Sequence, residues 1–338
     1  MSASARSMPI SARRSAWPAR GLPGFTGVCR LVDNWQFMRR MLAIAGLAGL
    51  VSTGCSIKKF AINKLGDSLA SSGTTFASDE DPDLVESALP FSLKLIESLL
   101  AESPRHRGLL FAASSGFTQY AYAFTQQEAD EVEEQDLAKA TALRTRARKL
   151  FLRARNYALR GLEVKRPGFE KALREDAKAA VRAASKADVP LLYWTAASWG
   201  AAISLSKDNP DLIADQPIVE ALIDRALELD ESFDNGAIHS FLITYEPSRQ
   251  GGTGDASARS RKHFQRAMEL AGGKQAAPLV SLAETVSVSK QDKKEFQSLL
   301  RRALEIDVDA KPAWRLSNLV MQRRARWLLG RIDQLFLE

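Results

Sequence analysis

The chain of 338 residues carries a formal net charge of +7, but residues 1–54 contain seven arginines and one aspartate, so the remainder is close to neutral. This distribution excludes a nucleic-acid-binding protein, which needs a concentrated basic face. The two cysteines are Cys29 and Cys55. From Cys55 onward, the sequence therefore excludes a disulfide framework and a site built from several thiolates.

Residues 1–37 are rich in Ser, Ala, Arg and Pro and show no periodic apolar face. A segment of this composition has too little apolar surface to form a packed core. We interpret it as a disordered extension or as the result of a start codon assigned too early, with Met38 as the natural start.

Residues 38–54 have the layout of a secretory signal peptide. Two arginines near its start precede eleven uncharged residues, which are too few to cross a bilayer. Small residues then lead to Cys55, the position at which a bacterial lipoprotein is acylated, although Ser52 stands where such sequences commonly have Leu. A short buried helix of a cytosolic domain is the alternative. The arginine start and the small-residue end favour a lipoprotein signal peptide.

Residues 55–82 are expected to form a helix next to the lipid anchor, followed by a linker. Apolar side chains recur every four residues over 57–70, which predicts the helix. The polar stretch that follows ends at Asp81, a predicted helix N-cap, and at Pro82, a residue favoured in the first turn of a helix.

Residues 83–338 are predicted to form the main domain, because their apolar period is helical throughout. We expect helices over about 84–102, 107–128 and 137–164, with an acidic bend between the last two. No segment longer than a few residues alternates apolar and polar side chains, which is the pattern of a half-buried strand. The predicted fold class is therefore all-α.

A repeated helix ending organises this domain. An arginine, a small residue and two apolar residues that flank a glutamate recur in Arg225–Asp230, Arg266–Ala271 and Arg302–Asp307, with weaker copies at Arg160–Lys165 and Glu97–Glu102. The small residues are expected to let a partner helix pack closely; they are Ser98, Gly161, Ala226, Ala267 and Ala303. The second helix of a tetratricopeptide (TPR) repeat ends in this way, so we predict a TPR-like helix-pair solenoid with irregular repeats.

The last predicted helix, within residues 315–336, is amphipathic and basic. Binding to a membrane surface is one interpretation. A stack of repeats needs a terminal cap, and we therefore predict that this segment is a C-terminal capping helix.

The sequence contains no recognisable metal or cofactor motif. His106, His239 and His263 lie far apart, with no carboxylate at the spacing of a metal-ligand motif, and each is expected to be structural. The glycine-rich segment 251–254 follows no predicted strand and precedes no Gly-Lys-Ser/Thr, so it indicates an inter-helix loop. We predict no metal and no cofactor.

An acidic run and a basic helix are predicted to face each other. The acidic residues are Glu128, Asp130, Glu131, Glu133, Glu134 and Asp136, and the basic ones are Arg144, Arg146, Arg148, Lys149, Arg153 and Arg155. A calcium loop needs fixed ligand spacing and a tight glycine turn, and neither is present. We expect a solvated bend whose electrostatic partner is the basic helix, unless that helix is simply exposed.

The segment 193–202 combines large aromatic side chains with small residues. Tyr193, Trp194 and Trp199 could line a groove for an apolar ligand or a partner helix, or they could belong to the core. The same two interpretations apply to the aromatic residues of an earlier helix, Phe117, Tyr120 and Phe124.

Over about residues 53–338 the chain resembles the T component of TRAP-type transporters, a family of TPR-like periplasmic lipoproteins. The resemblance is carried by the segments 54–57, 62–69, 72–82, 88–110, 115–124, 193–208 and 315–336. It implies a non-enzymatic helical subunit, lipidated at Cys55 and anchored in the periplasm at the outer membrane. It also implies a homo-oligomer, a trimer, that docks the periplasmic solute-binding (P) component and handles a hydrophobic small molecule.

Two other classes of function remain open from the residues. The first is a generic TPR lipoprotein scaffold of the outer membrane that serves envelope assembly and has no ligand of its own. The second is a hydrolase with a spatially assembled site, for which the sequence offers no motif.

Overall fold

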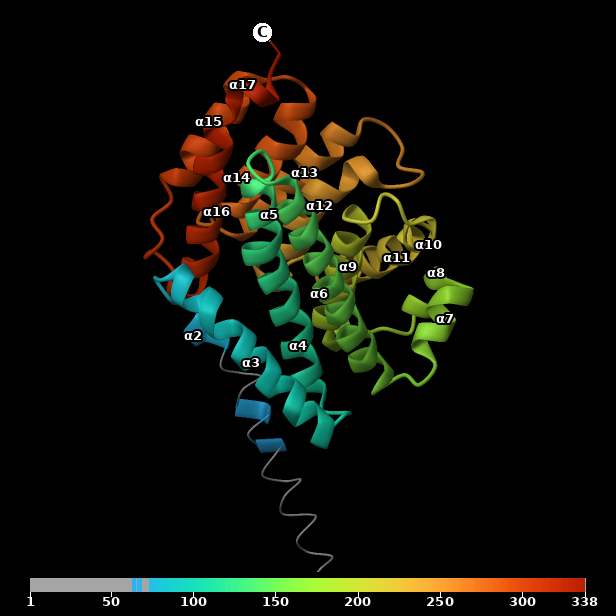
Figure 1. Ribbon diagram of the computed structural model, residues 1–338. Coiled ribbons are helices and arrows are strands. Elements are labelled where there is room, and N and C mark those ends of the chain that lie inside the picture. The colour runs from blue at the N-terminus through green and yellow to red at the C-terminus, as the bar shows by residue number, and fades with distance from the viewer. Residues whose placement is uncertain (1–62, 65, 69–72, 338) are drawn as a thin grey trace, which may run out of the picture. The chain divides into compact units, whose positions relative to one another are not determined.

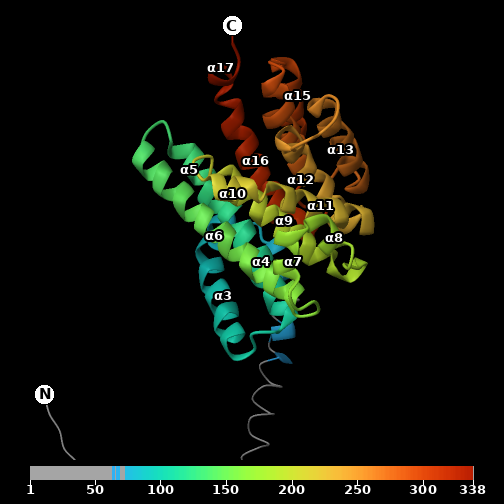
Figure 2. The same cartoon turned by 90° about the vertical axis from the view of Figure 1, so that its right-hand side faces the viewer.

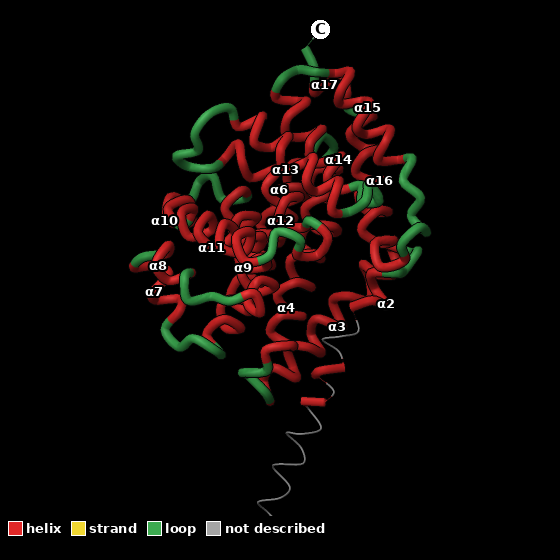
Figure 3. The backbone as a smooth tube through the Cα atoms, turned by 180° about the vertical axis from the view of Figure 1, so that it is seen from behind, coloured by secondary structure: helices red, strands yellow, loops and turns green. Residues whose placement is uncertain are grey.

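The computed structural model describes residues 63–64, 66–68 and 73–337, and every regular element in that part of the chain is helical (Figures 1 and 3). The all-α prediction is confirmed. The chain divides into residues 1–56 and 57–338, and the first unit lies wholly outside the described residues. The predicted signal peptide and Cys55 therefore lie outside them as well. Among the described residues, no helix is both long enough and apolar enough to span a bilayer.

The segment predicted as a linker contains a short helix, α2 (Gly73–Ala77), which corrects that expectation. Phe76 packs against the hydrophobic cluster that contains Val85, Leu93 and Phe117. In addition, α2 contacts α16 (Arg315–Leu329) and the short η6 (Pro312–Trp314). Phe76 and a hydrogen bond from Arg315 to the carbonyl of Ser78, at 2.8 Å, thus hold this segment in place. Of the helix expected over 57–70, the described residues 63–64 and 66–68 are helical.

The next helices follow the predicted order. The first is α3 (Pro82–Glu102), and Asp81 is its N-cap, accepting hydrogen bonds from the amides of Asp83 and Leu84 at 3.0 Å each. Then α4 (Arg107–Tyr120), the π-helix η1 (Ala121–Gln126) and α5 (Gln127–Val132) run on without a break, followed by α6 (Leu137–Glu163).

The remaining helices are α7 (Phe169–Glu175), α8 (Ala177–Val181), α9 (Val189–Ser204), α10 (Pro210–Ala214), α11 (Gln216–Leu229), α12 (Ala237–Tyr245), α13 (Ala256–Leu270), α14 (Ala277–Leu282), α15 (Lys293–Leu304) and α17 (Ile332–Leu335). Shorter helical turns are η2 (Lys186–Asp188), η3 (Phe233–Asn235), η4 (Glu246–Ser248) and the π-helix η5 (Ala283–Ser287). Side chains of Asp or Asn cap the first turns of α3, α6, α8, α10, α13 and α15.

The five copies of the repeated phrase end α3, α6, α11, α13 and α15. At four of them the small residue is buried, as expected, and a Cβ atom added at Gly161 would lie 2.9 Å from Cδ2 of Leu191 on α9. The expectation is wrong at Ser98, which is exposed. The reason is that Ser98 points away from the buried side of α3, which is formed by Leu93, Ile96 and Leu100.

Consecutive helices pack against each other along the described chain. The main contacts pair α3 with α4, α4 with α6, α6 with α9, α9 with α11, α12 with α13, α14 with α15 and α15 with α16 (Figure 2). In addition α16 contacts α2 and α3, so the predicted cap touches the first helices as well as the last ones (Figure 1). The TPR-like character of these pairs stays a prediction.

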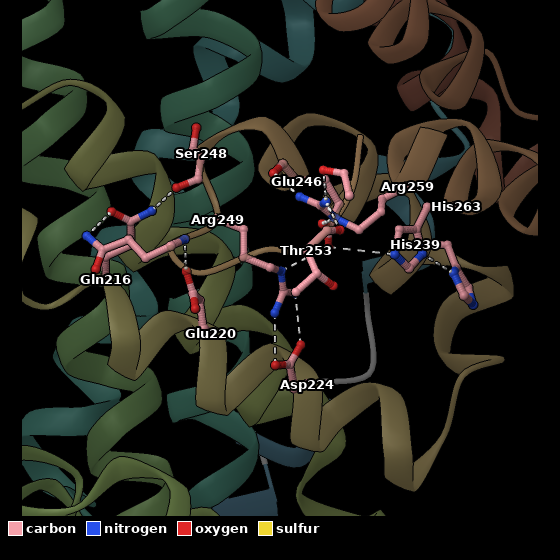
Figure 4. A network of polar contacts seen from close by, with 12 residues as sticks. Gln216, Glu220, Asp224, His239, Glu246, Ser248, Arg249, Thr253, Arg259 and His263 are labelled. Carbon is pink, nitrogen blue, oxygen red and sulfur yellow. Dashed lines mark hydrogen bonds and ion pairs between the residues drawn. The ribbon is translucent and has the colours of Figure 1, made fainter. Parts of the chain in front are cut away.

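The helix α12 joins two large hydrophobic clusters. Ile238 and Leu242 belong to the cluster built by α6, α9 and α11, whereas Ile243 belongs to the cluster built by α13 to α16. Beside this joint lies a network of polar contacts (Figure 4). The buried carboxylate of Glu246 accepts hydrogen bonds from Arg249 and Arg259.

Candidate functional site

The structure separates the aromatic residues singled out in the sequence into core residues and residues that solvent can reach. Trp199 is fully buried, and its indole Nε1 donates a hydrogen bond to Oδ2 of Asp215 at 3.2 Å. The guanidinium groups of Arg155 and Arg174 lie 4.7 and 5.7 Å from the centre of its ring. These contacts make Trp199 part of the packing of α9 against its neighbours.

The three aromatic residues singled out on α4 and η1, Phe117, Tyr120 and Phe124, are also buried. Phe117 stacks on Tyr157 of α6, with ring centres 6.0 Å apart. Tyr120 and Phe124 contact each other at 5.7 Å, and Arg146 lies over the Tyr120 ring. All three therefore serve the contact between α4, η1 and α6 in this structure.

Tyr193 and Trp194 are half-buried, and their rings meet edge to face at 4.9 Å. Tyr193 also contacts Phe233 of η3 at 5.4 Å, and Phe233 and Phe241 of α12 are half-buried against the same cluster. We call these four residues the α9 aromatic face. Half-exposed aromatic rings on three adjoining elements can contact an apolar solute or a partner side chain.

A buried aspartate fixes the start of α9. Asp188 is fully buried and binds Arg107 of α4 and Arg166, whose Nη2 lies at 2.8 Å. Burial by itself would raise the pKa of Asp188, but hydrogen bonds from Ser185 and Arg166 outweigh it and lower this pKa to about 2. The ionised carboxylate thus connects α9 to α4, and this role could not be predicted because Arg107 lies 81 positions away along the chain.

Asp234 lies beside the α9 aromatic face, and Lys311 lies close to it. Asp234, next to Phe233, has a positive φ of 45°, a backbone region that Asp and Asn tolerate better than other non-glycine residues. Burial raises the pKa of Asp234, and the charge of Lys311 partly opposes this rise. Burial also raises the pKa of Tyr193, and the charge of Asp234 adds to that effect. The face is therefore apolar with one acidic group at its edge.

The acidic bend has two partners, of which the sequence predicted one. Asp130 and Glu133 bind Arg144 of the basic helix α6 at 3.1 and 2.6 Å, as expected. The same bend also binds α16 and Arg331, two positions after its end. The ion pairs are Arg323–Glu131, Arg324–Asp130 and Arg331–Glu134, at 2.6, 3.1 and 2.7 Å. The bend thus connects the C-terminal helix to α5 and α6.

The three histidines take part in helix packing. Nδ1 of His106 accepts a hydrogen bond from the amide of Leu109 at 3.1 Å and so caps α4. His239 of α12 and His263 of α13 approach each other through their Nδ1 atoms at 2.8 Å (Figure 4). Over the described residues, no three His, Cys, Asp or Glu side chains gather in a way that could hold a metal ion.

Two shallow hollows lie along α13 and α15. One, of about 320 Å³, is lined by Phe264, Leu282 and Leu299 together with charged residues, and the other, of about 310 Å³, by Met268, Leu279 and Ile306. Arg302 borders both. Both hollows have mixed apolar and charged linings. They lie on the cluster built by α13 to α16, whereas the α9 aromatic face lies on the cluster built by α6, α9 and α11.

Comparison with known proteins identifies one family. Residues 78–336 match the family described as TRAP transporter T-component. An uncharacterized protein of Treponema pallidum (strain Nichols) is 27% identical over 317 residues, which cover 88% of this chain and 98% of that protein.

Proposed function

This chain belongs to the TRAP transporter T-component family, and from that premise we propose that it is a non-enzymatic periplasmic subunit that docks the solute-binding component of a TRAP-type transporter. The observation that carries the proposal is the extent of the family match, which runs over 78–336 and so includes α3 to α17. A match of this extent assigns the whole helical domain to the family, not one shared helix pair.

We choose the α9 aromatic face as the docking surface. Its four rings are half-buried, and interfaces are enriched in aromatic side chains at their centres. We place the partner, or a hydrophobic solute that passes between the two proteins, on Tyr193 and Trp194. Trp199, Phe117, Tyr120 and Phe124 then support this surface from the core.

The proposal includes the membrane anchor and self-association that the family resemblance implies. Lipidation of Cys55 would hold the subunit at the outer membrane, since stable anchoring takes more than one acyl chain and a lipoprotein cysteine carries several. A homo-oligomer, for which we propose a trimer, would present several docking surfaces together and strengthen a weak contact by avidity.

Co-purification tests the proposal. The full chain with a C-terminal tag is isolated from native membranes in mild detergent, and mass spectrometry identifies the protein and any small molecule that accompany it. We expect a periplasmic solute-binding protein, and we expect Cys55→Ser to move the chain out of the membrane fraction. Recovery of the chain alone, or with envelope-assembly proteins only, would instead favour a generic TPR scaffold.

A further inference from the structure

One face of α3 exposes large apolar side chains to solvent. Among the described residues six large hydrophobic residues are exposed, and three of them lie on this helix: Leu84 at 56%, Phe91 at 75% and Leu95 at 37%. Together with the half-buried Ala88 they recur at the spacing of one helical turn, which places all four on one stripe of the helix. We call these four residues the outer face of α3. An exposed apolar patch on a folded protein marks a surface that contacts a partner or a membrane.

The outer face is not the side on which α3 packs against the rest of the protein. The helix contacts its neighbours with another stripe, which contains the buried residues Val85, Leu93, Ile96 and Leu100. Its main contacts are those with α4 and α16, and α3 lies at the edge of the described helices in both views (Figures 1 and 2). The helix therefore carries a second apolar stripe that its packing does not require.

The chain that leads from the predicted lipid anchor enters the domain beside the C-terminal end of α3. The hydroxyl of Ser103, the residue after this helix, donates a hydrogen bond to Oδ1 of Asn63 at 2.8 Å. Asn63 follows Cys55 by eight positions, and eight residues of fully extended chain span at most about 28 Å. Phe91 lies about 18 Å along the helix from Ser103. Acyl chains on Cys55 would therefore keep the outer face of α3 near the bilayer surface.

The size of the outer face favours a membrane over a protein as its occupant. From Leu84 to Leu95 the face is about 17 Å long. It consists of four residues, whereas a stable protein interface takes roughly 20–30 residues from each partner. A second copy of this chain could not bury enough surface through so narrow a stripe. A bilayer needs no such minimum, because its contact with a helix strengthens with each apolar side chain that enters it.

The charges around the outer face indicate which lipids it suits. The side chain of Lys94 is 67% exposed and pairs with Glu97 at 2.5 Å. Exposed acidic residues lie on the same helix and next to it, namely Asp81, Asp83 and Glu102. These side chains form no basic patch that would attract anionic lipids. Insertion of apolar side chains would therefore drive the contact, and lipids without net charge suffice for it.

We propose that the outer face of α3 is a membrane-contact surface. Phe91 and Leu95 insert at the boundary between the head groups and the acyl chains of the lipid leaflet that holds the anchor. The inference rests on the lipid anchor of the proposed function and goes beyond it. An anchor alone does not determine which side of the domain faces the membrane, whereas a second contact through α3 does.

The test places a fluorescent label on the outer face of the anchored chain. Phe91→Cys is labelled with a bimane maleimide, and the lipidated chain is reconstituted into phosphatidylcholine vesicles with or without brominated acyl chains, which quench a fluorophore that reaches them. We expect quenching at Phe91→Cys to be roughly threefold or more stronger than at Leu137→Cys. Leu137 is the matched control, because it is a 65% exposed leucine at the start of α6. The unsubstituted chain gives the blank, since its acylated Cys55 has no free thiol.

The outcomes separate this inference from the proposal on which it rests. Since Phe91 is exposed, its substitution should leave the unfolding temperature unchanged. Equal quenching at the two positions, or quenching of the Phe91→Cys label only by iodide in the water, would overturn the inference. Protection from both quenchers would overturn it as well, in favour of a second copy or another protein on this face. A chain that does not stay with the vesicles would remove the anchor and this inference together, whereas an anchored chain without quenching would remove this inference alone.

Discussion

Two tryptophans five positions apart on one helix have different surroundings. Trp199 is enclosed by Asp215, Arg155 and Arg174, while Trp194 stays half-buried beside Tyr193. Because successive residues of an α-helix are rotated by about 100°, these two side chains lie on different faces of the helix. Trp199 is therefore a core residue of α9, whereas Trp194 has a surface that a partner could contact.

We predict that substitutions of the two tryptophans have opposite consequences. Trp199→Ala should lower the free energy of unfolding by roughly 3–5 kcal/mol, because it removes a fully buried ring. Trp194→Ala should change it by roughly 1 kcal/mol or less and reduce co-purification of the solute-binding component. Urea unfolding and pull-down yields measure these effects. Wild-type stability of Trp199→Ala would contradict its core placement, and an undiminished yield with Trp194→Ala would remove the α9 aromatic face from the docking surface.

His239 and His263 form a pH-sensitive contact at the joint between the two large clusters. With their Nδ1 atoms 2.8 Å apart, one ring must donate and the other accept, so both rings cannot be protonated. Burial lowers the pKa of both, and that of His263 falls to about 4, with the neighbouring His239 as the next cause. Glu231, Glu246 and Asp224 oppose this shift, while Arg249 and Arg266 support it.

The sign of the resulting pH dependence follows from the lowered folded-state pKa. Between about pH 6.5 and 4 the unfolded chain binds a proton that the folded chain rejects, so stability is full above pH 6.5 and falls as the pH falls through that window. The loss for His263 is on the order of 3 kcal/mol. We expect His263→Gln to lose less stability than the wild type between pH 7.5 and 5.0 in urea titrations. If stability falls equally with pH in the two proteins, the histidine pair does not determine how stability changes between pH 7.5 and 5.0.

At the residue scale, the sequence could show which side chains are aromatic but not which of them solvent reaches. The pattern of α9 is apolar on nearly every face, so its period cannot separate Tyr193 and Trp194 from Trp199. Asp188 and Glu284 were missed because the arginines that bind them, Arg107 and Arg324, come from distant helices.

At the scale of elements, α16 contacts α2 and α3 as well as α14 and α15. Arg324 is largely buried and binds both Glu284 and Asp130, whereas Arg323 forms a more exposed pair with Glu131. Adjacent residues on one helix thus make a shielded and a solvated ion pair. We expect the shielded pair of Arg324 to contribute more to the free energy of unfolding than the pair of Arg323, because solvent and salt screen the exposed pair.

We predict that Arg324→Ala destabilises the protein by roughly 2–3 kcal/mol, since it leaves two partly buried carboxylates without their shared partner. Arg323→Ala should cost about 1 kcal/mol or less, and raising the salt concentration should reduce that smaller cost further. Thermal unfolding at low and high salt measures both. Equal effects of the two substitutions would contradict the role assigned to Arg324.

Most elements could be predicted from the sequence, because caps and apolar periods are local. Asp81 begins α3 as expected. The acidic segment was predicted as a bend from about residue 128, but α5 continues to Val132, so the bend before α6 is shorter than predicted. The exposed Ser98 and the helix α2 could not be predicted, since both depend on which neighbour covers a helix. The second partner of the acidic bend also escaped prediction, because it lies almost 200 positions further along the chain.

At the scale of the molecule, helices that follow each other in sequence are neighbours in space, and α16 adds contacts to the first helices. This arrangement buries apolar side chains between neighbouring helices. The family match over 78–336 agrees with a role in transport.

Sedimentation velocity of the Cys55→Ser chain mixed with the purified solute-binding component is the decisive test of docking. We predict a new, faster-sedimenting species that contains both proteins, saturates with one partner per protomer and diminishes with Trp194→Ala. Independent sedimentation of the two proteins at concentrations of about 100 μM, where even weak complexes form, would contradict the docking role.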